Sequence, residues 1–157
     1  MSGAGAPDLS VDGSGLRVAI IAGSWHQEII DGMIAGAEQT LLDSGAEQVL
    51  FRVGGAFELP LAAQAALRAG YDAAVCLGVI VRGGTPHFEY VSSAVTEGLT
   101  RVALDESKPV GFGILTVDTE QQAFDRSGLP GSRESKGQEA AEAALQVAVL
   151  ARTIRAA

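Results

Sequence analysis

The chain has 157 residues, of which 47% are hydrophobic, a length and composition that fit one domain with a substantial core. Its 19 acidic residues against 11 basic residues give a formal net charge of -8, which argues against nucleic acid or an anionic membrane as a partner. The single cysteine, Cys76, excludes an intrachain disulfide framework.

Residues 1–15, MSGAGAPDLSVDGSG, have the Gly, Ser and Pro content of a flexible tail. Leu9 and Val11 alternate with polar residues, so the segment is also suited to pairing as an edge strand. It lacks the basic and apolar regions of a secretory signal, and no apolar run approaches the roughly 20 residues of a membrane helix. We therefore expect a cytoplasmic protein in which residues 16–157 form a single domain.

Four short apolar runs are typical of strands buried on both faces; they span 16–23, 48–53, 73–81 and 109–117. Segments with apolar residues at helical spacing separate them and follow the last one; these lie at 30–41, 58–70, 91–102 and 136–155. The alternation predicts an α/β fold, a three-layer sandwich with a four-stranded parallel sheet and helices on both faces. The flavodoxin-like strand order 2-1-3-4 is the simplest order that provides a switch point.

Local signals support these boundaries. Ser24 followed by Gln27 predicts a capping box at the start of the first helix. Pro60 is suited to a first helical turn, and Gly45 and Gly70 are suited to helix ends.

Ligands of such sheets bind beyond the carboxyl ends of the strands. There Trp25, in GSWHQ, is either a surface cap or a stacking platform for a flat heterocycle, and His26 is expected to be a solvated helix residue. Glu58, in GGAFELP, either accepts hydrogen bonds from substrate hydroxyls or complements a helix dipole. Arg126 and Lys136, after the fourth strand, are solvated charges on the simplest interpretation.

The segment RGGTPHFE, which follows the third strand, carries the strongest signal. Its glycines leave backbone N–H groups uncovered at a helix start, so Gly83, Gly84 and Thr85 are suited to holding a phosphate. His87 has an ordinary pKa of about 6.5, which suits proton transfer near neutral pH, although a lone histidine is more often a cap or packing residue. The sequence has no metal-ligand cluster and no nucleophile motif, so we expect no metal and no covalent catalysis.

Taken in order, GSWH, GAFELP, GVIVRGGTPHFEYV, PVGFGILTVDTEQQAFDR and SKGQEAAEAAL closely resemble the lumazine synthase family, from about Leu16 to the last helix. The resemblance implies condensation of 5-amino-6-(D-ribitylamino)uracil with 3,4-dihydroxy-2-butanone 4-phosphate to 6,7-dimethyl-8-ribityllumazine, with release of phosphate and water and with no cofactor. It makes His87 the proton-transfer residue and Arg126 its partner at the phosphate. The other substrate-binding residues that it implies are Trp25, Ala56, Phe57, Glu58, Val79, Ile80, Val81, Gly84, Thr85, Phe112 and Lys136.

The resemblance also implies a homo-oligomer in which Phe112 and Arg126 reach the site from a neighbouring subunit. The segment SGLPGSRESKG is longer than the compact loop of shell-forming relatives, and Ser135 replaces a common asparagine, so a free pentamer is favoured over a larger shell. Gly54, where proline is frequent, and Gly84, where many relatives have a larger residue, are further departures. The alternatives are a related riboflavin synthase, a non-catalytic flavin carrier and a purely structural shell.

Overall fold

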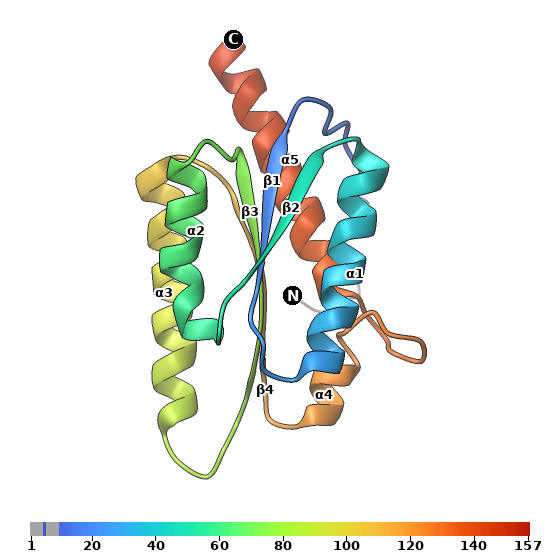
Figure 1. The fold of residues 1–157 in the computed structure, drawn as a ribbon, viewed down its shortest axis with the longest axis vertical. Helices are drawn as coiled ribbons and strands as arrows, with labels where there is room; N and C mark the ends of the chain where they lie inside the picture. Colours follow the sequence, from blue (N-terminus) through green and yellow to red (C-terminus); the bar gives the residue numbers. More distant parts are fainter. Residues whose placement is uncertain (1–4, 6–9) are drawn as a thin grey trace.

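The computed structural model describes residue 5 and residues 10–157, and within them the chain forms one parallel sheet with helices on both faces (Figure 1). The strands are β1 Arg17–Ala22, β2 Glu47–Arg52, β3 Ala73–Val81 and β4 Val110–Val117. The helices are α1 Gln27–Ser44, η1 Ala56–Glu58, α2 Leu59–Arg68, α3 His87–Glu106, α4 Glu120–Phe124 and α5 Lys136–Ala156. The strand order is β2-β1-β3-β4 with every neighbouring pair parallel, which confirms the predicted fold.

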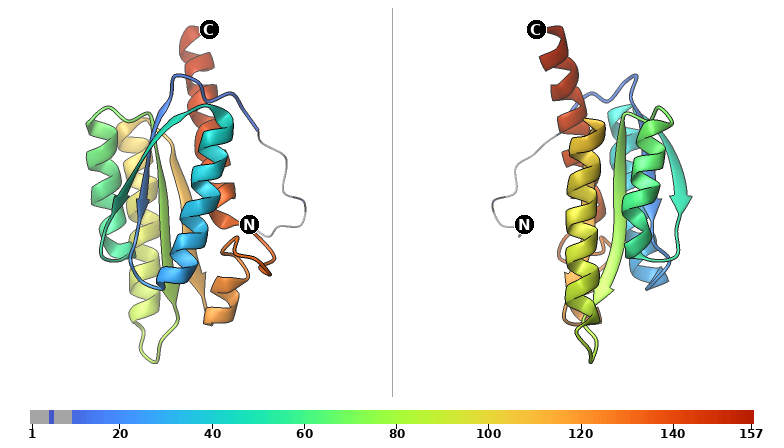
Figure 2. Two further views of the ribbon diagram at one scale, coloured as in Figure 1. Left: turned by 45° about the vertical axis from the view of Figure 1, so that its right-hand side comes forward. Right: turned by 90° about the vertical axis from the view of Figure 1, so that its left-hand side faces the viewer.

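Alternating side chains of the central strands divide the core into two halves, as the pleat of a strand requires. Val18 and Ile20 of β1 belong to one cluster with residues of α1 and α5, and Ile21 belongs to a second cluster with residues of α2 and α3. Figure 2 shows these two helix layers on opposite sides of the sheet. The sheet is therefore a rigid middle layer that fixes the positions of its end loops.

The helices approach one another closely where small residues allow it. A Cβ atom at Gly137, in the first turn of α5, would lie 2.0 Å from the carbonyl oxygen of Met33 in α1. Only glycine fits at this contact without a shift of one helix. The alanine-rich face of α5, with Ala141 and Ala144 fully or almost fully buried, continues the same close packing.

The strands end at different heights along the edge that carries the loops. β1 makes its last pair with β3 at Ala22 and Leu77, whereas β3 continues beside β4 to the pair Val81 and Val117. The last four residues of β3 therefore have no strand beside them on the β1 side. This step in the sheet leaves space above Val79–Val81 that the loops after β1 and β2 surround.

Two details differ from the sequence predictions. Ser24 forms no capping box: its Oγ donates to the carbonyl oxygen of Val53 at 2.7 Å, and His26 is the N-cap of α1 in a left-handed conformation with φ 56°. The run at 48–53 is not buried on both faces: among the described helices β2 is packed chiefly by α1, and Val49, Leu50 and Phe51 are about 40% exposed. The other edge strand, β4, is covered by α5 and α3 and is largely buried. The helices that cover a strand, which periodicity does not reveal, decide this burial.

The other boundary predictions are confirmed. Gly45 caps α1 with φ 82°, Gly70 follows the end of α2 with φ 107°, and Pro60 lies in the first turn of α2. Leu9 lies outside the described residues, while Val11 packs partly buried against the core. No helix in the described part of the chain is long and apolar enough to cross a membrane.

Candidate active site

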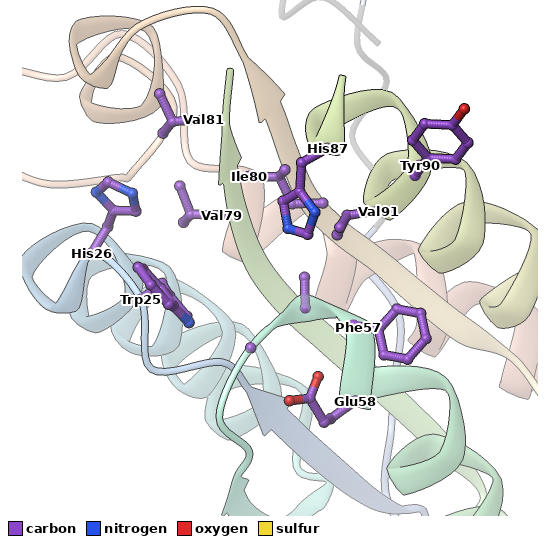
Figure 3. A pocket seen from close by; sticks show the side chains of 12 residues that line it. Trp25, His26, Phe57, Glu58, Val79, Ile80, Val81, His87, Tyr90 and Val91 are labelled. Atoms are coloured by element: carbon purple, nitrogen blue, oxygen red, sulfur yellow. The ribbon is translucent and has the colours of Figure 1, made fainter. Parts of the chain in front are cut away.

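A cavity of about 640 Å³ opens at the step in the sheet, beyond the end of β1 and along the end of β3 (Figure 3). The loops after β1, β2 and β3 all contribute to it, as the position of ligands in parallel sheets predicts. Its walls are made by Trp25, His26, Gly55, Ala56, Phe57, Glu58, Val79, Ile80, Val81, His87, Tyr90 and Val91. Eight of the thirteen residues predicted for the site are thus brought together.

Trp25 presents an uncovered aromatic surface to this cavity. Its side chain is 69% exposed, and its indole edge rests on the loop after β2, where a Cβ at Gly55 would lie 3.3 Å from the indole Nε1. An exposed indole held against a glycine backbone can accept a flat ring on its free face. This geometry is compatible with the predicted stacking platform and with a side chain that a neighbouring subunit covers.

Glu58 ends the short helix η1, which turns Ala56, Phe57 and Glu58 toward the cavity. A Cβ at Gly54 would lie 3.5 Å from Glu58 Oε1, so the carboxylate lies against the loop that also supports Trp25. Among the described residues, no hydrogen bond or ion pair engages this carboxylate. It is free to accept hydrogen bonds from hydroxyl groups of a ligand.

Val79, Ile80 and Val81 form the floor of the cavity where β3 extends past β1. Val79 is buried and the next two residues are half-buried. At this height β3 pairs with β4 on one side and has no strand on the other side. The floor of the cavity therefore combines apolar side chains with the backbone of β3 on the side without a strand. Such a floor suits the edge of a flat polar heterocycle.

His87 opens α3 at the mouth of the cavity, directly after the exposed loop 82–86. Its backbone N–H lies 3.5 Å from Thr85 Oγ1, and a Cβ at Gly83 or Gly84 would meet no atom within 4 Å. The N-terminal end of this 20-residue helix attracts anions. Gly84 and Thr85 do not line the cavity itself but lie in the loop beside it.

The remaining predicted residues lie elsewhere on the chain. Phe112, Arg126 and Lys136 line a second cavity of about 230 Å³ along β4, the edge strand on the far side of β3. Arg126 Nη1 donates to the carbonyl oxygen of Gln122 at 2.9 Å, and in the described part of the chain no carboxylate pairs with this guanidinium. Its positive charge is thus available to an external anion.

Lys136 differs from Arg126 because it is already surrounded by carboxylates. Its Nζ lies 3.0 Å from both Glu134 Oε2 and Glu139 Oε2. Desolvation lowers the pKa of Lys136, but the hydrogen bonds and charges of these two glutamates outweigh it and raise the pKa overall. Lys136 is therefore engaged by two carboxylates, whereas Arg126 in the same cavity is not.

A family model described as 6,7-dimethyl-8-ribityllumazine synthase matches residues 15–152. The chain belongs to the 6,7-dimethyl-8-ribityllumazine synthase family. A protein of that name from Leifsonia xyli subsp. xyli is 64% identical over 157 residues, covering 99% of both chains. Those from Micrococcus luteus, 60% identical over 92% of this chain and 93% of the relative, and from Streptomyces coelicolor, 52% identical over 98% and 97%, carry the same name. The family that the motifs indicated is confirmed.

Four residues that line this cavity were not assigned to the site from the sequence: His26, Gly55, Tyr90 and Val91. His26 was expected to be a solvated helix residue, but it is the N-cap of α1, and its Nδ1 lies 3.7 Å from Glu120 Oε1. Tyr90 and Val91 follow His87 by three and four positions, which places them on the same helix face. That spacing could have identified them from the sequence.

Proposed function

We propose that this chain catalyses the reaction of its family, the condensation of 5-amino-6-(D-ribitylamino)uracil with 3,4-dihydroxy-2-butanone 4-phosphate to 6,7-dimethyl-8-ribityllumazine. It is then a transferase of riboflavin biosynthesis. The observation that carries this proposal is the cavity in which His87 opens α3 beside a phosphate-suited loop, opposite the free indole of Trp25 and the free carboxylate of Glu58. A cytoplasmic location remains a prediction.

In this proposal the pyrimidine ring lies on the floor of Val79–Val81 and stacks on Trp25. The ribityl chain runs along Ala56 and Phe57, and Glu58 accepts hydrogen bonds from its hydroxyls. The phosphate of the second substrate is bound by the amides of Gly84 and Thr85. The apolar cavity thus binds the flat, neutral substrate, and the backbone amides of the loop bind the anionic one.

The chemistry needs proton transfers at each step. The amine attacks the ketone and water leaves to give an imine. The C–O bond to phosphate then breaks as a carbon-bound proton is lost, and the resulting enol takes up a proton on carbon to become a ketone. The second amine attacks this ketone and closes the ring with loss of a second water. His87 is exposed at the cavity mouth and can exchange protons with both substrates. A positioned imidazole contributes about 10²–10⁴-fold to such reactions, and the pairing of two bound reactants contributes further through effective molarities of about 10⁵ M or more.

We also propose that the complete site forms between two subunits. Phe112, Arg126 and Lys136 line a different cavity from His87, so a second copy must supply them if they act at the same site. Trp25, Phe57 and Phe112 are large aromatic side chains that the single chain leaves about half or more exposed, as expected of surfaces that a neighbouring subunit covers. A ring of five copies remains the favoured assembly, with a larger shell as the alternative.

The first experiment combines the purified protein with both substrates and follows lumazine absorbance together with phosphate release. Turnover well above the uncatalysed background, with one phosphate per lumazine, supports the proposal. Binding of the pyrimidine without acceleration would instead support the carrier alternative. Dismutation of added lumazine without use of the butanone phosphate would support the riboflavin synthase alternative.

A further inference from the structure

The side chain of Arg82 joins three structural elements around the loop 82–86. Its Nε donates to Asp118 Oδ1 at 2.8 Å in the turn after β4, and its Nη1 donates to Glu89 Oε1 in the first turn of α3. The guanidinium also lies over the ring of Phe88, with its carbon 4.3 Å from the ring centroid. Arg82 does not line the cavity.

We propose that Arg82 is a positioning residue that holds the loop 82–86 and the start of α3 in the geometry that binds phosphate and presents His87. The proposal rests on the proposed function and extends it to the residue that orders the phosphate loop. Arg82 acts through the backbone of this loop and does not itself touch a substrate.

The loop has little else to order it. Two consecutive glycines have more conformational freedom than any other pair of residues, and a Cβ at either would contact nothing within 4 Å, so no neighbouring atom confines them. Within the described residues, the backbone bonds at this loop are Arg82 N–H to the carbonyl oxygen of Val117 and Glu89 N–H to that of Pro86. These bonds, with the contact of His87 N–H and Thr85 Oγ1 at 3.5 Å, hold the ends of the loop, and the Arg82 side chain joins those ends to each other and to the turn after β4.

Arginine has the chemistry for such a contact. Its planar guanidinium donates in two directions and stacks on an aromatic ring at the same time, whereas a lysine ammonium is a single charge on a flexible stem. By bonding Glu89 and stacking on Phe88, Arg82 connects the residue before the glycines with the residues after His87. The bond to Asp118 ties this connection to the turn after β4.

The pairing also argues against Arg82 as the phosphate ligand. Its guanidinium is already engaged by two carboxylates, and the hydrogen bond from Arg82 lowers the pKa of Glu89. The group formed by Arg82, Glu89 and Asp118 therefore carries a net negative charge, which does not attract phosphate. Ordering of the backbone amides is the contribution that this geometry permits.

The test compares Arg82→Ala with Arg101→Ala. Arg101 forms an exposed ion pair with Asp105 on the same helix α3, away from the loop, and is the matched control. We expect Arg82→Ala to raise the KM for the butanone phosphate, and the Kd for inorganic phosphate, by about 10- to 100-fold, since small displacements of binding groups have effects of this size. The Kd for the pyrimidine should change less than about twofold, because the contacts with Trp25, Glu58 and β3 remain.

Charge-preserving variants separate positioning from direct binding. In Arg82→Lys and Asp118→Glu the charges remain but the fork geometry is lost, so we expect both to weaken phosphate binding in the same direction as Arg82→Ala. Near-normal phosphate affinity in both variants would overturn the proposal, since a direct charge contact would survive. Equal losses for pyrimidine and phosphate, or equal behaviour of Arg82→Ala and Arg101→Ala, would overturn it as well.

The thermal unfolding of each variant is measured in parallel, and the exposed position of Arg82 predicts only small changes. The inorganic phosphate titration does not depend on turnover. If wild type failed to convert the two substrates, the proposed function would fail, while the phosphate titration of the variants would still decide the role of Arg82.

Discussion

His87 and Arg126, the two residues that the sequence assigns to catalysis, line two different cavities of the same chain. His87 begins the helix after β3, whereas Arg126 follows the short helix after the edge strand β4. If both residues act on one substrate, as we propose, a second copy has to supply one of them. The proposed catalytic pair would then form only in the assembly.

Mixing two inactive variants tests this relationship. Subunits with His87→Ala and subunits with Arg126→Ala are each expected to have low activity, but random co-assembly should restore roughly a quarter of the interfaces, which then combine an intact His87 with an intact Arg126. The measurement is turnover after joint refolding of the two variants in equal amounts. Activity no higher than the mean of the separate variants would show that both residues act within one subunit.

His87→Ala alone should reduce turnover by about 10²–10⁴-fold, the usual contribution of a general acid–base residue. Assembly size and pyrimidine affinity should stay unchanged, because the side chain is exposed. His26→Ala, on the opposite wall of the same cavity, is the control and should retain much more activity. Steady-state kinetics of both variants, with mass measured by light scattering, check this prediction.

Arg126→Ala should weaken use of the butanone phosphate more than binding of the pyrimidine, because a charge-assisted contact matters most to the charged ligand. A loss of about 1.5–3 kcal/mol is expected for such a contact. Arg133→Ala provides the control, since Arg133 is an exposed arginine in the same segment that pairs with Asp125. Separate titrations of each ligand measure the difference, and equal losses for both ligands would contradict the phosphate assignment.

Gly137→Ala should destabilise the fold by about 3 kcal/mol, because its new methyl group would overlap the carbonyl oxygen of Met33 and force α1 and α5 apart. Gly84→Ala is the contrasting variant. It has open space for a methyl group and should be neutral or more stable by about 0.4–1 kcal/mol. Urea denaturation at one fixed protein concentration compares the two, and similar stabilities would show that the helix contact adapts more easily than expected.

Cys76 offers a test of the core at alkaline pH. Burial raises the pKa of its thiol from 9.0 to about 12, so above pH 9 the unfolded chain loses a proton that the folded chain keeps. The stability that this thiol contributes should therefore decline as pH rises from 9 toward 12. The difference in unfolding free energy between wild type and Cys76→Ala, measured at pH 7.5 and 10, isolates this effect. A constant difference would mean that the thiol is accessible to water.

Much of the fold was predictable because strands and helices carry different periodicities. The runs at 73–81 and 109–117 and the helix after Ser135 appear almost where predicted. Ser24 and His26 were not predicted correctly, because the contact of Ser24 with Val53 joins residues 29 positions apart. A local capping pattern contains no information about such a partner.

The sequence by itself determined the family, the parallel sheet and the types of residues at its carboxyl edge, since motif order and hydrophobic period are local properties of the chain. Only the tertiary structure decided which of those residues share a cavity. The step at the end of β1 creates the space beneath Trp25, and the position of β4 at the sheet edge separates Phe112 and Arg126 from His87. The physical reason is that strand order and strand ends depend on contacts between distant segments, which no short stretch of sequence specifies.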